Sequence, residues 1–178
     1  LITGAAGFIG GNFSRFLADR HPAMELLLLD KLSAYSSMGA IQELIDTGRA
    51  RFVRLDLSDT DSVYDLISSE QPDFTVNFAA ESHNDRAILD SRPFVYSNVV
   101  GAFNLLEATR LHNPAGRLVH ISTIEVYGEQ AATVPFFTEA SPLNAKTPYS
   151  ASKAAADLLV RSHMQTYPHL DLAMTHCA

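Results

Sequence analysis

Cysteine, basic runs and long apolar runs are what this sequence has least of. One cysteine, Cys177, in 178 residues excludes an intramolecular disulfide, and a reducing, cytoplasmic setting is the default expectation. The net charge is −7 and lysines and arginines form no run, which argues against a nucleic-acid partner. No apolar stretch reaches membrane-spanning length, so no membrane partner is expected. The seven histidines are scattered without an H-E-x-x-H pattern, and no metal site is predicted.

What is present suffices for one domain. Hydrophobic residues make up 47% of the chain, an ordinary value for a globular domain of this length. The sequence begins at Leu1 inside an apolar run, without an initiator methionine, and it stops at Ala178 without terminal punctuation. We therefore expect a single domain over residues 1–178 that is a fragment of a longer protein.

The first ten residues carry the most informative pattern. Three glycines are spaced G-x-x-G-x-x-G between an apolar strand end and the amphipathic segment Phe8–Arg20. The first suits a tight turn, the second leaves room for a pyrophosphate, and the third lets the helix pack closely. The N–H groups and dipole of that helix N-terminus then face the phosphates. An acidic residue follows about 20 residues on, so we predict a dinucleotide site. The predicted cofactor contacts here are Gly4, Gly7, Phe8, Ile9 and Gly10.

Strand-like and helix-like segments alternate along the chain. The predicted strands are Leu1–Thr3, Glu25–Asp30, Arg51–Asp56, Asp73–Ala79, Arg117–Ser122 and Leu170–His176. The predicted helices are Phe8–Arg20, Met38–Thr47, Thr60–Glu70, Pro93–Leu111 and Pro148–Tyr167. Uninterrupted apolar runs indicate strands buried on both faces, and right-handed crossovers then give an α/β fold with a doubly wound parallel sheet, the Rossmann fold. The long irregular stretch Gly128–Thr147 is predicted to cover a site.

Polar or small residues follow three of the predicted strands, at the edge where ligands bind in such sheets. At the end of the second strand, the Asp30 carboxylate can accept hydrogen bonds from both ribose hydroxyls of an adenosine and repel a 2′-phosphate, which favours NAD over NADP. The adjacent Lys31 weakens that preference, and a helix N-cap is the alternative for Asp30. Asp56 is either an adenine contact or a turn or cap residue. The predicted cofactor contacts at these strand ends are Asp30, Lys31, Asp56, Leu57, Ala79 and Ala80.

Tyr149 and Lys153 carry the predicted chemistry. Spaced i, i+4 near the start of a predicted helix, they project from one face, one turn apart. An ammonium beside a phenol favours the phenolate, so we expect a lowered pKa for Tyr149 and a role as general base. The same spacing also occurs among surface polar residues. Here Thr123 ends the preceding strand and can share the substrate proton, which favours catalytic roles for all three residues, with Tyr149 and Lys153 also contacting the cofactor.

Together these residues resemble an extended short-chain dehydrogenase/reductase acting on nucleotide sugars. The run A-A-E-S-H-N-D-R at 79–86 is similar to the A-A-E-S-H-x-D-R run of dTDP-glucose 4,6-dehydratases, and S-N-V-V-G at 97–101 is similar to their T-N-V-x-G helix. Residues 30–33, 122–128 and 148–153 also fit, so the resemblance covers essentially the whole chain. It implies a hydro-lyase whose NAD-binding domain is this chain, with a C-terminal nucleotide-sugar domain missing.

The resemblance also implies a reaction, from dTDP-glucose to dTDP-4-keto-6-deoxyglucose. Tyr149 takes the proton of the C4 hydroxyl while hydride passes to a tightly held NAD, helped by Lys153 and Thr123. Glu125 then removes the C5 proton, water is lost across C5–C6, and hydride returns to C6. The implied substrate contacts are Ser82, Thr123 and Glu125.

One residue departs from the family pattern. The family reads S-T-D-E-V-Y-G, whereas this chain has Ile124 in place of the aspartate that protonates the departing C6 hydroxyl. Isoleucine cannot transfer a proton, and loss of one general acid costs about 10²–10⁴-fold in rate. A uronate decarboxylase, which needs only C4 oxidation, and a 4-epimerase, for which Glu125 is surplus, therefore stay open. A non-catalytic NAD-binding protein is the alternative of another class, against which the intact Thr123, Tyr149 and Lys153 argue.

Two further expectations concern surfaces. The predicted helices Pro93–Leu111 and Pro148–Tyr167 have wide apolar faces with small residues, and we predict that they form a homodimer contact. Ordinary core packing is the alternative use of those faces, while the resemblance favours the dimer. Asp85 and Arg86 are predicted to form an ion pair.

Overall fold

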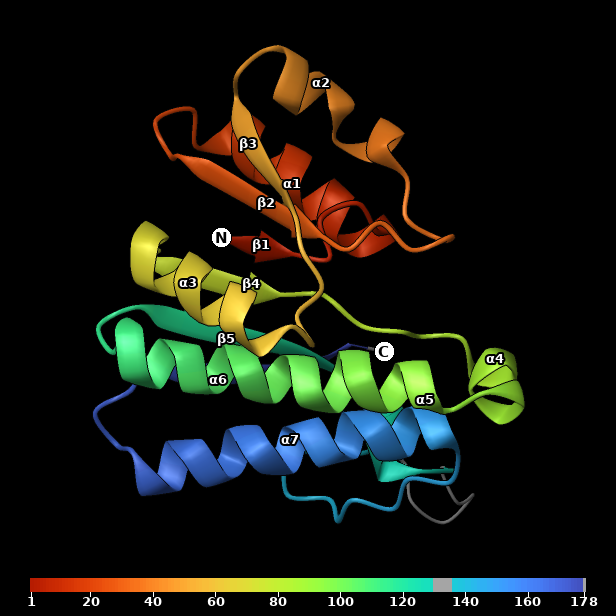
Figure 1. Cartoon of the computed structure of the whole chain (residues 1–178). Coiled ribbons are helices and arrows are strands. Elements are labelled where there is room, and N and C mark those ends of the chain that lie inside the picture. Colours follow the sequence, from red (N-terminus) through yellow and green to blue (C-terminus); the bar gives the residue numbers. More distant parts are fainter. Residues whose placement is uncertain (130–135, 178) are drawn as a thin grey trace.

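The sheet explains where ligands can approach this molecule. The computed structural model in Figure 1 describes residues 1–129 and 136–177. Within them six parallel strands form one sheet in the order β3-β2-β1-β4-β5-β6. They are β1 (Ile2–Thr3), β2 (Leu26–Asp30), β3 (Ala50–Arg54), β4 (Phe74–Asn77), β5 (Arg117–Thr123) and β6 (Leu172–Cys177). The order reverses between β1 and β4, which opens a crevice at their carboxyl ends and confirms the predicted doubly wound sheet.

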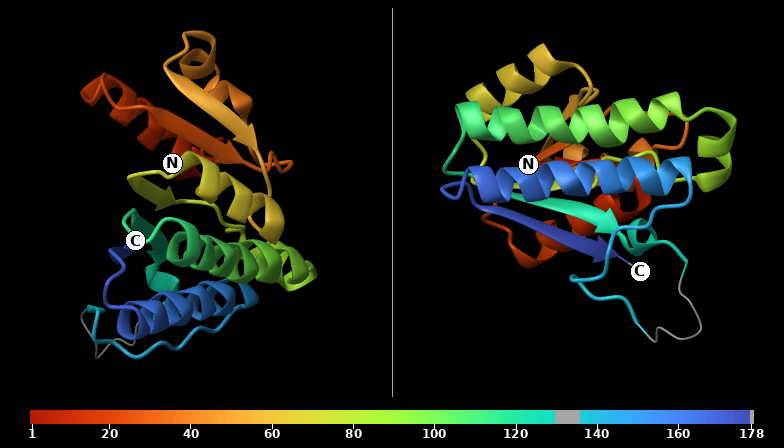
Figure 2. Two further views of the ribbon diagram at one scale, coloured as in Figure 1. Left: turned by 60° about the vertical axis from the view of Figure 1, so that its left-hand side comes forward. Right: turned by 90° about the horizontal axis from the view of Figure 1, so that it is seen from below.

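Helices cover both faces of the sheet. They are α1 (Phe8–Arg20), α2 (Gln42–Asp46), α3 (Thr60–Glu70), α4 (Asn84–Leu89), α5 (Arg92–Phe94), α6 (Gly101–His112) and α7 (Pro148–Thr166). Figure 2 shows α6 and α7 side by side on one face together with α3, whereas α1 lies on the other face. None of the helices within the described residues is both long and apolar enough to cross a membrane.

The leucines of β2 connect the two halves of the core. Successive side chains of a strand point to opposite faces, so one strand can fill two layers. Leu26 and Leu28 pack with Ala18 of α1 in one buried cluster, while Leu29 packs with residues of α3 and α6 in another. This arrangement confirms that the apolar run is a strand buried on both sides.

The predicted helix Pro93–Leu111 is confirmed in extent, because the chain is helical from Arg92 to His112, but three pieces of different helical geometry make it up. A π-helical turn at Val95–Val100 separates α5 from α6. Such wide turns often occur at functional sites. Here the turn buries Ser97 and Asn98, and both side chains bind residues at the carboxyl edge of the sheet. The short α4 and the 3₁₀ turn Ile124–Tyr127 (η3) were not predicted, because neither is long enough to show an apolar repeat.

Candidate functional site

The glycine-rich turn between β1 and α1 is tight for steric reasons. Gly4 has a φ of +65°, and a Cβ there would lie 2.7 Å from the backbone nitrogen of Ala79. A Cβ on Gly10 would collide with the carbonyl oxygen of Gly4. Gly7 is the N-cap of α1, without a side-chain cap, so its position leaves the start of the helix open. The turn thus brings the N-terminus of α1 close to the ends of β1 and β4.

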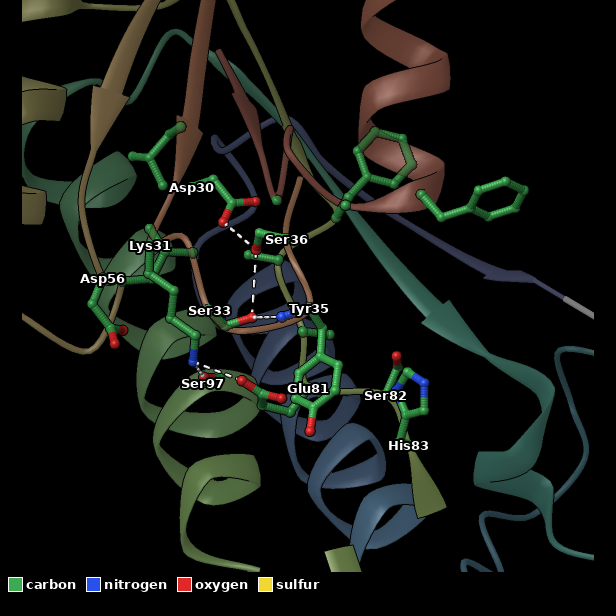
Figure 3. Close-up of a pocket in the computed structure, with 18 of the residues that line it drawn as sticks. Asp30, Lys31, Ser33, Tyr35, Ser36, Asp56, Glu81, Ser82, His83 and Ser97 are labelled. Carbon is green, nitrogen blue, oxygen red and sulfur yellow. Dashed lines mark hydrogen bonds and ion pairs between the residues drawn. The ribbon is translucent and has the colours of Figure 1, made fainter. Parts of the chain in front are cut away.

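A cavity of about 210 Å³ lies beside this turn, at the carboxyl ends of β1 to β4 (Figure 3). Most of the predicted cofactor contacts line it, and the predicted substrate contact Ser82 lines it too. The cofactor contacts that line it are Gly4, Gly7, Phe8, Asp30, Lys31, Asp56, Leu57, Ala79 and Ala80. Ile9 and Gly10, in the first turn of α1, do not line the cavity, and neither do Tyr149 and Lys153 on α7.

Asp30 fixes the loop after β2 as well as facing the cavity. Its buried carboxylate accepts hydrogen bonds from the backbone nitrogens of Ala6 (3.0 Å) and Leu32 (2.8 Å) and from the Ser36 hydroxyl (2.8 Å; Figure 3). No helix begins at this residue, so the N-cap alternative is wrong. The Ser36 hydroxyl therefore occupies one acceptor position of this carboxylate, and the predicted contact between Asp30 and a ribose stays a prediction.

Asp56 forms a turn rather than a helix cap. One of its carboxylate oxygens accepts hydrogen bonds from the backbone nitrogen and hydroxyl of Ser58, both at 2.9 Å. Asp59 is the N-cap of α3, through a hydrogen bond from the backbone nitrogen of Ser62. The predicted contact between Asp56 and an adenine stays a prediction.

A buried carboxylate connects the strand ends on either side of β1. Glu81 lies 2.9 Å from the Lys31 ammonium (Figure 3) and 3.3 Å from the Arg86 guanidinium. Arg86 also lies 3.7 Å from the ring centroid of Tyr35, a cation–π distance. The predicted ion pair between Asp85 and Arg86 is wrong, since Arg86 binds Glu81. Neighbouring residues on a helix do not face each other, which explains the error.

The second half of the site lies beyond the end of β5. Thr123 ends that strand and Glu125 follows on η3, while Tyr149 and Lys153 come from the first turns of α7. A capping box between Thr147 and Ser150, together with a proline at the first helical position, fixes where α7 begins. Lys153 is 3% exposed and its ammonium donates a hydrogen bond to the Ile121 carbonyl at 2.7 Å.

The expected lowering of the pKa of Tyr149 is wrong for this structure. Burial raises the pKa of Tyr149 and the Glu125 carboxylate raises it further, while a hydrogen bond with Thr123 opposes the rise. Burial lowers the pKa of Lys153 to about 8, against the opposing effect of Asp157. The ammonium is thus desolvated and directed to a carbonyl, and it does not depress the pKa of the phenol as sequence spacing suggested.

Sequence reasoning missed two polar links. Asn84, at the start of α4, donates a hydrogen bond to Glu125 (2.8 Å) and accepts one from the Thr147 hydroxyl (2.7 Å). Asn98 binds the backbone of Glu81 and the Ser152 hydroxyl, so it joins the cavity edge to α7. The only signal for Asn84 was its place within the 79–86 run, at the position that the resemblance left variable.

The stretch predicted to cover a site is described only in part, since residues 130–135 lie outside the described residues. From its described part, Phe137, Leu143 and Ala145 pack against a buried cluster made of residues of η3 and α7. Ile124 lies in η3 with 39% of its surface exposed, so it is available to a ligand beside Glu125. Among the described residues, no three His, Cys, Asp or Glu side chains group as metal ligands.

These features define a doubly wound α/β protein with a glycine-rich turn at the strand-order reversal and a Tyr–Lys pair beyond the neighbouring strand. The sequence matches the profile of the GDP-mannose 4,6 dehydratase family over residues 1–177. The chain belongs to that family.

Individual relatives agree with this assignment. The chain is 44% identical to a dTDP-glucose 4,6-dehydratase of Mycolicibacterium smegmatis over 168 residues, 94% of this chain and 49% of the relative. A dTDP-glucose 4,6-dehydratase from Streptomyces venezuelae, solved with NAD bound, has a TM-score of 0.89 at 39% identity, covering 99% of this chain and 54% of that one. A UDP-Glc/GlcNAc 4-epimerase from Campylobacter jejuni has a TM-score of 0.86 at 30% identity, with 97% and 51% coverage. The chain spans about half the length of the curated relatives it matches.

Proposed function

We propose that this chain provides the NAD site and the catalytic side chains of a nucleotide-sugar 4,6-dehydratase that acts on dTDP-glucose. The observation that carries the proposal is the meeting of Thr123, Glu125 and Tyr149 beyond β5, close enough for Glu125 and Thr123 both to affect the pKa of Tyr149. The relatives named dTDP-glucose 4,6-dehydratase support the substrate. A cytoplasmic location stays a prediction, and it depends on the single cysteine.

The lining of the cavity beside the glycine turn suits the phosphate groups of a dinucleotide. Its floor has no side chain at Gly4 or Gly7, and the open N-terminus of α1 supplies N–H groups for phosphates. When bound, NAD would accept hydride from the sugar C4 and return it to C6. The oxidised nicotinamide ring is a cation, and a positive charge near Tyr149 would lower the pKa of its phenol, opposing the effect of burial.

The side chains beyond the end of β5 would carry out the proton transfers. Tyr149 would take the proton of the C4 hydroxyl, with the Thr123 hydroxyl sharing it, and the buried Lys153 ammonium would contact the cofactor beside them. The resulting 4-ketone acidifies C5–H, and Glu125 would remove that proton. With isoleucine at position 124, Glu125 would also deliver the proton to the leaving C6 hydroxyl, so a single carboxylate would serve both steps.

A uronate decarboxylase is the second candidate, and the exposed Ile124 favours it because loss of CO₂ from a β-keto acid needs no acid there. The natural protein carrying this sequence should be incubated with NAD and either dTDP-glucose or UDP-glucuronate. A 4-keto-6-deoxy sugar from dTDP-glucose supports the dehydratase. Release of CO₂ from UDP-glucuronate, a C4 epimer, or no product from either sugar would each contradict it.

The proposed NAD preference depends on the charge of Asp30. Asp30→Asn keeps one acceptor oxygen, which can still bind the Leu32 N–H, but turns its NH₂ group toward the Ala6 N–H and removes the negative charge that would repel a 2′-phosphate. We expect the preference for NAD over NADP to fall by roughly tenfold, about 1.4 kcal/mol, in titrations with both cofactors. Ser36→Ala is the matched control, because it removes a partner of Asp30 and leaves the charge. An unchanged preference in Asp30→Asn would show that another residue sets it.

We also propose a homodimer through α6 and α7. These helices lie side by side, and each leaves large apolar side chains in solvent, with Phe103 41%, Leu158 57% and Met164 42% exposed. A face of this kind favours protein contact.

Leu158→Asp should therefore convert the protein to monomer at micromolar concentration, because a buried unpaired carboxylate opposes association. Sedimentation velocity measures the change. Phe16→Asp, at a 51% exposed position on α1 and the other face of the sheet, should stay dimeric. A wild-type protein that sediments only as monomer contradicts the proposal.

A further inference from the structure

Asn84 connects two segments that carry the proposed chemistry. Its side-chain nitrogen donates to a carboxylate oxygen of Glu125 at 2.8 Å, and its side-chain oxygen accepts from the Thr147 hydroxyl at 2.7 Å. A carboxylate only accepts hydrogen bonds, so the amide must turn its NH₂ group to Glu125 and its oxygen to Thr147. The orientation of Asn84 is therefore determined by its partners.

Thr147 is in turn fixed by the start of α7. Its hydroxyl oxygen accepts a hydrogen bond from the backbone nitrogen of Ser150, as the N-cap of the helix that presents Tyr149 and Lys153. The chain of bonds thus runs from the N-terminus of α7, through Asn84, to Glu125. It gives the carboxylate a position defined relative to the phenol, although Glu125 itself is exposed on a four-residue turn.

We propose that Asn84 is a positioning residue for Glu125, one that aims its carboxylate at the C5 proton. This inference rests on the proposed dehydratase function. An exposed glutamate on a short turn would otherwise populate several rotamers, and a misplacement of about 1 Å can cost a hundredfold in rate. Accurate placement of Glu125 matters more here because position 124 has no proton donor. The one carboxylate must both remove the C5 proton and protonate the departing C6 hydroxyl.

The test separates the step that Glu125 performs from the oxidation that precedes it. The natural protein and its Asn84→Ala variant are incubated with the 4-keto-6-deoxy product in D₂O, and incorporation of deuterium at C5 is followed. We expect exchange to slow by roughly tenfold to a hundredfold, because an ionic hydrogen bond orienting the base is lost. The KM for dTDP-glucose and the single-turnover rate of C4 oxidation should stay within about twofold of wild type, because neither depends on the orientation of Glu125.

Two further variants distinguish positioning from a general structural role. Asn84→Asp keeps the acceptor for Thr147 but loses the donor, so it should slow exchange at least as much with α7 still capped. Asp85→Asn changes the neighbouring exposed residue and should leave exchange unchanged. In a Glu125→Gln background, Asn84→Ala should have no additional effect, because residues that act through one another are not additive.

Each contrary outcome has its own meaning. Equal exchange in wild type and Asn84→Ala, an equal loss of C4 oxidation, or an additive effect in the Glu125→Gln background would overturn the positioning role. Failure of the wild-type protein to form a 4-keto sugar from dTDP-glucose would overturn the proposed function and this inference with it. That result is read from the wild type alone, before any variant is compared.

Discussion

Tyr149→Phe should lower the rate of C4 oxidation of dTDP-glucose by about 10²–10⁴-fold, the contribution of a positioned general base. The phenol is 7% exposed and its ring packs against Phe94, so phenylalanine keeps the packing and removes only the hydroxyl. The KM should change little, because the lost interaction acts on the transition state. Formation of the reduced cofactor in a single turnover measures the effect.

Tyr127→Phe is the control for this substitution. Tyr127 is also buried, on η3, and its hydroxyl lies 3.4 Å from a ring nitrogen of His176. The Tyr127→Phe variant also loses one hydroxyl group from a buried side chain, and its rate of C4 oxidation should match that of the wild type. If Tyr149→Phe retained oxidation within about tenfold of wild type, less than a general base contributes, another group would have to take the C4 proton.

The fold could be predicted because its signals are local. The leucine run of β2 needs both faces covered whatever lies around it, and Gly4 is demanded by its own positive φ and the approach of Ala79. Likewise, the spacing of Tyr149 and Lys153 places both on one face of any helix. These signals are complete within a few residues of sequence, so the doubly wound parallel sheet followed from them.

The polar links could not be predicted, because they join segments distant in the chain. Asn84 lies 41 residues from Glu125 and 63 from Thr147, and Glu81 meets Lys31 from the far side of β1. The direction of the pKa shift of Tyr149 depends on burial by neighbours such as Phe94, which spacing does not reveal. Such features depend on how the packed layers meet, and sequence periodicity carries no information on that.

Glu125→Gln should abolish elimination while C4 oxidation survives. The amide has nearly the same size but cannot take the C5 proton, so the rate of water loss should fall by at least about 10²–10⁴-fold. Tyr149, Lys153 and Thr123 remain, and hydride therefore leaves C4 without returning to C6. The measurable result is accumulation of the reduced cofactor on the enzyme, without 4-keto-6-deoxy sugar.

Glu139→Gln, a change of another exposed carboxylate in the described part of the chain, should leave both steps unchanged. An active Glu125→Gln variant would contradict the assignment of the base.

Ile124→Asp then tests whether one carboxylate really carries two proton transfers. A second donor next to Glu125 would protonate the leaving C6 hydroxyl, so elimination should be faster than in wild type if that step limits the rate. A uronate decarboxylase would instead lose affinity for its substrate, because the new carboxylate repels the sugar carboxylate. Where loss of the C6 hydroxyl limits the rate, unchanged or lower activity on dTDP-glucose would therefore count against the dehydratase, since the donor that its chemistry lacks at position 124 would have been supplied without benefit.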